Sequence, residues 1–286
     1  MKEFRDRVAV ITGAASGIGR GIAQRCAEEG MKVVLADIEE KALIQTEEEM
    51  EAAGASVLAV LTDVSKASDV ESLGQKTLDA FGAVHLLCNN AGVGTGATTW
   101  ESTLADWKWV IGVNLWGVIH GVRFFVPIML EQDTECHIVN TSSGVGLISS
   151  PYLGTYKVTK HAIVSLSETL YHELALRNAK IKVSVLCPTW VKTQLMEAER
   201  NRPAELSNDP AEEMRIRMSP EYQEVEKLVS EAVQSGISCQ QVADCVFNAI
   251  REEKFYILTE PEMVKPVVQL RMDDILQERN PTNPLP

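Results

Sequence analysis

The sequence lacks the clustered cysteine and histidine residues that metal centres require. Its six cysteines include no CxxC pair of the metal-binding type, and its five histidines show no ligand spacing. We therefore expect no metal ion. The cysteines are expected to be reduced packing residues of a cytoplasmic protein: Cys26, Cys88, Cys136, Cys187, Cys239 and Cys245. We also expect no secretory signal peptide before the first predicted strand.

Basic residues are in deficit, with 27 Lys and Arg against 40 Asp and Glu and a formal net charge of −13. A surface of that sign repels polyanions, which makes nucleic acid and anionic membranes poor candidates as partners. Internal repeats and low-complexity blocks are absent as well. A chain of 286 residues of this kind is predicted to form a single α/β domain, residues 1–286, with a substantial core.

One hydrophobic run, residues 109–130, could be mistaken for a membrane span. Asn114, His120 and Arg123 interrupt it, and Pro127 marks its last turns. We predict instead a helix that is apolar nearly all round. One side of such a helix covers a sheet, and another is available to a partner helix from a second subunit.

A glycine-rich turn follows the first apolar run. Residues 7–11 read as a strand buried on both faces, and they lead directly into residues 12–19, Thr-Gly-Ala-Ala-Ser-Gly-Ile-Gly. Gly13 permits a tight turn, Gly17 lets the backbone approach a pyrophosphate, and Gly19 lets the next helix pack close to the sheet. The free N–H groups of that helix then face phosphate oxygens.

A second buried strand, residues 32–36, ends in Asp37. A carboxylate at this place suits the ribose hydroxyls of NAD and repels the additional phosphate of NADP. Ile38 follows it and Ser16 stands in the glycine turn, so no arginine near these positions in sequence offers a fork for that phosphate. A glycine-rich loop on its own is usually a simple turn with no ligand. Here a helix, a strand and an acidic residue follow it at this distance, and that combination favours a dinucleotide site.

Tyr156 and Lys160 are four residues apart and therefore project from the same face of a helix. A free phenol has a pKa of about 10, and an ammonium group beside it lowers that value. Ser143, thirteen residues upstream at a strand end, could reach the same oxygen atom from another side. A lone YxxxK motif recurs by chance on ordinary helices, but here it accompanies the dinucleotide pattern.

Together these motifs resemble the short-chain dehydrogenase/reductase family over residues 5 to about 195. The further landmarks are Asp63-Val64, Asn89-Asn90-Ala91-Gly92, Val113-Asn114-Leu115 and Pro188-Thr189-Trp190-Val191-Lys192-Thr193. The resemblance implies four catalytic residues: Asn114, Ser143, Tyr156 and Lys160. It implies a cofactor site made of Gly13, Ser16, Gly17, Ile18, Gly19, Asp37, Ile38, Asp63, Val64, Asn90, Ala91, Gly92, Val113, Tyr156, Lys160, Pro188, Val191 and Thr193.

This resemblance implies a Rossmann-type, doubly wound parallel sheet of about seven strands with helices on both faces. It implies an NAD-dependent enzyme that interconverts a secondary alcohol and a ketone, assembled as a homodimer or homotetramer. In that chemistry Tyr156 is the acid/base, Ser143 bonds the carbonyl oxygen, Lys160 lowers the tyrosine pKa, and Asn114 holds a water beside the lysine. One departure is Thr189, which replaces the usual glycine and excludes positive φ.

The substrate side is less defined in the sequence. Residues that flank the catalytic groups suggest an apolar, aromatic or polycyclic substrate: Ser143, Val145, Leu147, Tyr152, Leu153, Tyr156 and Trp190. Residues 194–236 are interpreted as a substrate lid and residues 261–286 as a C-terminal tail. Within the lid, residues 194–219 read as a long loop in which Met196, Met214 and Met218 suit an apolar ligand, although a surface insert has the same pattern. A catalytically silent dinucleotide-binding or partner-binding protein remains the alternative function.

Overall fold

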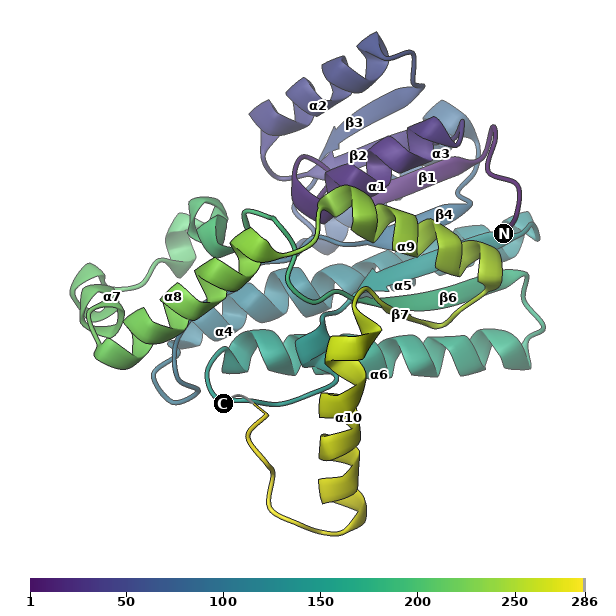
Figure 1. Ribbon diagram of the computed structural model, residues 1–286. Coiled ribbons are helices and arrows are strands. Elements are labelled where there is room, and N and C mark those ends of the chain that lie inside the picture. The colour runs from purple at the N-terminus through teal and green to yellow at the C-terminus, as the bar shows by residue number, and fades with distance from the viewer. Residues whose placement is uncertain (285–286) are drawn as a thin grey trace.

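The computed structural model describes residues 1–284, apart from the side chains of residues 212 and 221, and contains a seven-stranded sheet (Figure 1). Every pairing in this sheet is parallel, in the order β3-β2-β1-β4-β5-β6-β7. The strands are β1 (Val8–Thr12), β2 (Lys32–Asp37), β3 (Val57–Leu61), β4 (Leu86–Asn89), β5 (Cys136–Thr141), β6 (Ile181–Cys187) and β7 (Tyr256–Leu258). The order reverses between β1 and β4, which confirms the predicted doubly wound sheet and places a ligand crevice at this switch point.

The first half of the sheet is apolar throughout because helices cover both of its faces. In β1, Ala9 and Ile11 point to one core cluster while Val8 and Val10 point to another. The first cluster is closed by α1 (Gly17–Glu28), α2 (Glu40–Ala52) and α9 (Cys239–Glu252). The second is closed by α3 (Ala67–Phe81), α5 (Gly117–Gln132) and α6 (Gly154–Leu176).

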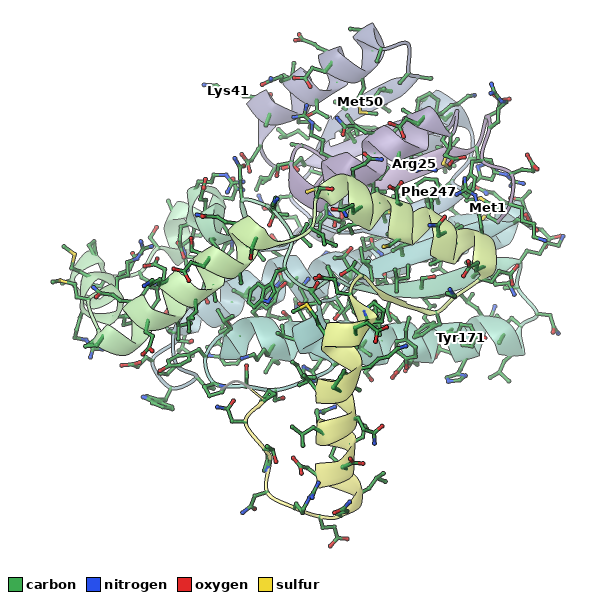
Figure 2. All side chains as sticks on the ribbon, viewed as in Figure 1. Met1, Arg25, Lys41, Met50, Tyr171 and Phe247 are labelled. Carbon is green, nitrogen blue, oxygen red and sulfur yellow. The ribbon has the colours of Figure 1, made fainter. Side chains whose placement is uncertain are left out.

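Helix α9 lies along α1, so the end of the chain stabilises its beginning. The Arg25 guanidinium of α1 lies 5.4 Å from the centre of the Phe247 ring on α9 (Figure 2). Helix α9 begins at the capping box predicted for Ser238 and Gln241, in which each side chain bonds the backbone N–H of the other residue. Helix α9 thus packs against the helix that follows the β1–α1 turn.

The apolar run 109–130 belongs to a continuous helical segment made of α4 (Leu104–Val110), the π-helical η1 (Ile111–Trp116) and α5. Among the described residues this segment, Leu104–Gln132, is one helix that is long and apolar enough by composition to cross a membrane. Here Phe125 and Met129 of α5 are fully buried in the second core cluster. The sheet therefore accounts for one apolar side of the segment.

After β6 the chain is more regular than the sequence suggested. The predicted long loop 194–219 instead forms the short helical turns η3 (Leu195–Asn201) and η4 (Ala204–Leu206) and the helix α7 (Pro210–Arg217). The helix predicted to follow is α8 (Pro220–Ser235), and the tail contains α10 (Pro261–Leu276), which extends away from the sheet (Figure 1). Pro203 immediately precedes η4 and Pro210 is the first residue of α7, because proline is well suited to a helix start.

Candidate active site

The β1–α1 turn forms a cradle for a pyrophosphate. Gly13 and Gly17 have φ values of +67° and +55°, which side chains other than glycine rarely adopt. A Cβ on Gly19 would overlap the carbonyl oxygen of Gly13, so only glycine lets α1 start this close to the turn. The shape of the cradle thus depends on the three predicted glycines, and the N-terminus of α1 opens toward the switch point.

Asp37 is held at the end of β2 by two backbone groups. Its carboxylate accepts hydrogen bonds from the N–H of Ala15 at 2.9 Å and of Glu39 at 3.0 Å. Burial raises the pKa of Asp37, and these backbone hydrogen bonds oppose that rise. The side chain is therefore fixed between the glycine turn and the cleft. There its carboxylate can accept hydrogen bonds from the hydroxyl groups of a ribose.

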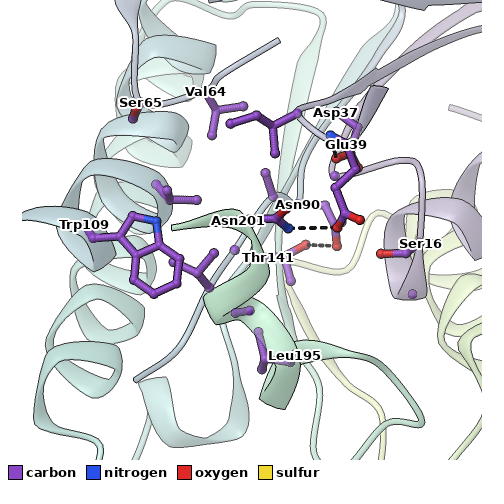
Figure 3. A pocket seen from close by; sticks show the side chains of 18 of the residues that line it. Ser16, Asp37, Glu39, Val64, Ser65, Asn90, Trp109, Thr141, Leu195 and Asn201 are labelled. Atoms are coloured by element: carbon purple, nitrogen blue, oxygen red, sulfur yellow. Dashed lines mark hydrogen bonds between the residues drawn. The ribbon is translucent and has the colours of Figure 1, made fainter. Parts of the chain in front are cut away.

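The ends of β1, β4 and β5 are tied together beneath the cleft. The Thr12 hydroxyl accepts the N–H groups of Asn90 and Ala91 at 2.9 and 3.1 Å. The Asn90 side chain donates to the Thr12 carbonyl and accepts from the Thr141 hydroxyl (Figure 3). Sequence reasoning placed Asn90 and Ala91 beside the cofactor, whereas Thr12, which positions both, could be identified only from the contacts.

A pocket at the switch point collects most of the predicted cofactor residues. The lining includes Gly13, Ser16, Gly17, Ile18, Asp37, Ile38, Asp63, Val64, Asn90, Ala91, Gly92, Val113, Tyr156, Lys160, Pro188 and Thr193. Gly19 lies behind the turn, and Val191 lines a neighbouring pocket. The glycine cradle, the fixed acid and the strand-end loops fit a dinucleotide such as NAD.

Asn114 is fully buried in η1 and braces the loop after β4. Its Oδ1 accepts the N–H of Val93 at 2.8 Å, and its Nδ2 donates to the carbonyl of Val93 at 2.9 Å and to the hydroxyl of Thr159 at 3.2 Å. A π-helical turn often marks a functional position. Both ends of this amide are already bonded, so the predicted water beside Lys160 remains a prediction.

Lys160 and Tyr156 lie together on the first turns of α6. The Lys160 ammonium donates to the carbonyl of Thr141 at 2.9 Å and lies 5.3 Å from the centre of the tyrosine ring. Burial lowers the pKa of Lys160 to about 8. Burial also raises the pKa of Tyr156 to about 12, and a hydrogen bond with Ser143 opposes the rise. The expected lowering of the Tyr156 pKa by Lys160 is therefore not found, since desolvation of the phenol dominates.

Ser143 opens onto a second pocket, beside the first. Its hydroxyl accepts the N–H of Val145 at 3.3 Å in the short turn η2 (Gly144–Gly146). The predicted substrate residues Ser143, Val145, Leu153, Tyr156 and Trp190 line this pocket, together with Val191, Met196, Ile216, Tyr222, Val229 and Val233. Tyr156 lines both pockets and stands where they join.

Several predicted substrate-side residues lie elsewhere. Tyr152 and Leu147 are outside the lining of both pockets, as are Met214 and Met218, which are 61% and 67% exposed. The carbonyl of Tyr152 instead accepts a hydrogen bond from Lys157. Periodicity within a loop does not indicate which side chains turn inward, because that choice depends on the path of the backbone.

Thr189 occupies the usual glycine position without strain, since it is not among the residues with positive φ. Its hydroxyl donates to the carboxylate of Glu260 and lies 3.2 Å from the hydroxyl of Thr259. The side chain thus links the Pro188–Thr193 loop to the segment that precedes α10. A residue other than glycine is compatible with this loop conformation.

Sequence reasoning missed the residues of the segment after Thr193 that line the first pocket. These are Gln194, Leu195, Ala198, Arg200, Asn201, Pro203 and Leu206. The same pocket is also lined by Glu39, Lys108 and Trp109. No motif marks them, because they approach the cleft only through long-range contacts. Within the described part of the chain, no His, Cys, Asp and Glu groups cluster as metal ligands, and all six cysteines are free.

Comparisons with known proteins agree with this geometry. The CLA biosynthesis dehydrogenase/reductase of Lactiplantibacillus plantarum is 35% identical over 281 residues, covering 98% of this chain and 97% of that protein. The C alpha-dehydrogenase of Sphingobium sp. strain SYK-6 is 32% identical, covering 92% and 83%. The crystal structure of a short chain dehydrogenase/reductase from Burkholderia phymatum in complex with NAD superposes with a TM-score of 0.95 at 49% identity, covering 100% of both chains. The sequence profile of the short chain dehydrogenases matches residues 7–204. The relatives matched by this chain are dehydrogenases and reductases, which are oxidoreductases acting on hydroxyl or ketone groups. The chain therefore belongs to the short chain dehydrogenase family.

Proposed function

We propose that this protein is an NAD-dependent dehydrogenase that interconverts a secondary alcohol and a ketone on a small-to-medium apolar substrate, with Tyr156 as the acid/base. The observation that carries the proposal is the position of Tyr156. It lines both the pocket at the switch point, which the predicted cofactor residues line, and the second pocket beside it. The fixed carboxylate of Asp37 and the NAD complex of a similar structure support NAD as the cofactor.

NAD, when bound, accepts the hydride in alcohol oxidation and supplies it in ketone reduction. The protein handles the proton. Tyr156 takes the hydroxyl proton during oxidation and returns it during reduction. Ser143, which lines the second pocket beside Tyr156, is placed to bond the carbonyl oxygen as charge develops there.

Lys160 completes this proton path. Its nitrogen is buried beside Tyr156, and a Cβ on Gly92 would lie 3.5 Å from both the Lys160 Nζ and the Asn114 Oδ1. A lysine with a pKa of about 8 exchanges protons near neutral pH. Lys160, whose nitrogen lies 5.3 Å from the centre of the Tyr156 ring, is the proposed partner for the proton that enters through Tyr156, while Asn114 fixes the wall of the site beside it.

The second pocket supports an apolar substrate, aromatic and polycyclic compounds included. Ile216, Tyr222, Val229 and Val233 of α7 and α8 face Leu153 and Trp190 across it. Truncation of Ile216 or Val229 to alanine should raise KM for bulky alcohols and leave KM for NAD nearly unchanged. Met214→Ala, on the exposed side of the same helix α7, is the matched control and should change neither value.

The outer faces of α5 and α6 support assembly with a second copy. A shallow apolar groove there is lined by Val122, Ala162, Ser165, Leu166, Thr169, Leu170 and Glu173. A homodimer or homotetramer is proposed, and sedimentation at several concentrations tests it. Cytoplasmic location stays a prediction from the sequence, tested by cell fractionation.

Steady-state NADH formation with a panel of secondary alcohols tests the proposed reaction. Tyr156→Phe should remove nearly all turnover, at least the ~10²-fold expected for a lost acid/base, while NADH binding persists because the ring still packs. NADH binding without turnover of any alcohol or ketone would instead support the alternative of a catalytically silent dinucleotide-binding protein.

A further inference from the structure

The segment that follows the Pro188–Thr193 loop roofs the cofactor pocket. Residues of η3 and η4 line the pocket opposite the glycine turn and the end of β2. Ala198 and Leu206 also pack with Trp109 and Val110 of α4. The segment therefore crosses the cleft from one wall to the other.

One end of this roof is fixed by a buried charge cluster. The Arg202 guanidinium bonds the carboxylate of Asp106 at 2.7 Å and that of Glu199 at 2.6 and 2.7 Å, and it lies 4.2 Å from the centre of the Trp109 ring. The side chains of Arg202 and Asp106 are only 6% and 7% exposed. Asn208 donates to the same Asp106 oxygen at 2.9 Å. A buried pair with all its partners in place opens rarely, so this end acts as an anchor.

The other end reaches across the cleft to Glu39. The Oε1 of Glu39 accepts hydrogen bonds from Arg200 at 2.7 Å and from Asn201 at 2.8 Å, as Figure 3 shows for Asn201. Glu39 in turn donates its N–H to the carboxylate of Asp37. Although burial raises it, the bonds from Arg200 and Asn201 hold the pKa of Glu39 below its ordinary value. The bridge therefore carries full charge at neutral pH, next to the proposed ribose-binding acid.

The two ends differ in how easily they open. The Glu39 and Arg200 side chains are 25% and 32% exposed, so water can replace their contacts at a far smaller cost than at the Arg202 anchor. Arg200 also donates to the carbonyls of Gln194 at 3.2 Å and Glu197 at 2.8 Å, so it stabilises the turn of η3 that forms the roof. Opening at Glu39 would release that side of the roof while Arg202 holds the other.

We propose that Glu39, Arg200 and Asn201 form a clasp that closes the roof over the bound dinucleotide and slows its release. The inference rests on the proposed dinucleotide cofactor and adds positioning residues that act on cofactor exchange rather than on hydride transfer. A dinucleotide lying between Asp37 and the glycine turn cannot leave on this side until the bridge to Glu39 opens.

The test is the dissociation rate of NADH, measured by stopped-flow fluorescence after mixing the NADH complex with excess NAD. Glu39→Ala and Arg200→Met each remove one side of the clasp. We expect each to raise the dissociation rate about tenfold, a change equivalent to 1.4 kcal/mol. The double variant should fall short of the sum of the two single effects, because each substitution alone already breaks the Glu39–Arg200 pair.

Arg20→Met is the matched control. Arg20 pairs with Glu49 between α1 and α2, and its side chain is 32% exposed like that of Arg200. Neither Arg20 nor Glu49 lines the pocket. The control should keep the wild-type rate. Dissociation rates within twofold of wild type in both folded clasp variants, or independent effects that add in the double variant, would overturn the proposal. Failure of the wild-type protein to bind NADH would instead refute the proposed function, so the two failures are distinguishable.

Discussion

The pH dependence of turnover tests whether Tyr156 and Lys160 act as one proton-transfer unit. Burial lowers the pKa of Lys160 to about 8 and raises that of Tyr156 to about 12. The first proton lost by the pair therefore leaves near pH 8, mainly from the lysine. Alcohol oxidation requires that the Tyr156–Lys160 pair has already lost one proton. As pH increases toward about 8, kcat/KM for an alcohol should therefore rise tenfold per pH unit, and above that pH it should level off. Ketone reduction needs the protonated pair and should fall above the same pH.

Lys160→Met removes the group that titrates near pH 8 and leaves the tyrosine alone. At pH 7 about one tenth of the wild-type pairs have lost a proton, whereas a phenol with a pKa of about 12 has lost only about one in 10⁵. The variant should lose about 10³- to 10⁴-fold in kcat/KM at pH 7, and its profile should keep rising beyond pH 9. A deuterated alcohol shows whether hydride transfer limits the measured rate, and an NADH titration separates any loss of cofactor binding.

Lys157 provides the matched control for this experiment. Burial lowers its pKa to about 8 as well, but its ammonium bonds backbone carbonyls of the 150–152 loop rather than lying beside the phenol. Lys157→Met should therefore keep the inflection near pH 8. The reasoning fails if Lys160→Met retains that inflection, or if the inflection disappears in Lys157→Met instead.

Three further outcomes follow from contacts in and around the cleft. Asp37→Asn removes the charge that repels the 2′-phosphate, so the ratio of kcat/KM for NAD over NADP should fall at least about tenfold, the scale of one charged hydrogen bond. Gly19→Ala forces a methyl group onto the carbonyl of Gly13, which should cost about 1–3 kcal/mol in chemical denaturation and weaken NADH binding in titrations. Lys157→Met leaves the carbonyls of residues 150–152 without their donor, next to Leu153 of the second pocket, so KM for the alcohol should rise while the Kd for NADH stays unchanged.

The features predicted correctly from the sequence are those that local chemistry determines. Strands buried on both faces need continuous apolar runs, and the turn between β1 and α1 needs glycine where φ is positive or where no Cβ fits. The capping box at Ser238 and Gln241 is likewise a relation between neighbours in the chain. These patterns identify the order of elements and hence the crevice where the sheet order reverses.

The pKa of Tyr156 could not be predicted in this way. The spacing of Tyr156 and Lys160 indicates that they are neighbours, and an ammonium group in water would lower the phenol pKa. Burial acts in the opposite direction on both groups, because it disfavours a phenolate and an ammonium alike. The extent of burial depends on how α6 packs against β5 and on the second pocket, and neither is visible in a motif five residues long.

The roof of the cofactor pocket escaped sequence reasoning for a related reason. The bridge from Arg200 to Glu39 joins residues 161 positions apart, and the bridge from Arg202 to Asp106 joins residues 96 positions apart. Charged residues in a segment punctuated by proline are typical of exposed loops, so the pattern is compatible with a surface insert as well as with the predicted lid. Only the fold brings Glu39 and Asp106 to opposite walls of one cleft, and those two acids determine where the segment lies. The same short segment lines the cofactor pocket with Ala198, Arg200 and Asn201 and contributes Met196 and Glu199 to the second pocket, which α7 and α8 complete. Because α7 and α8 line only the second pocket, we expect substitutions there to change substrate preference without changing cofactor retention.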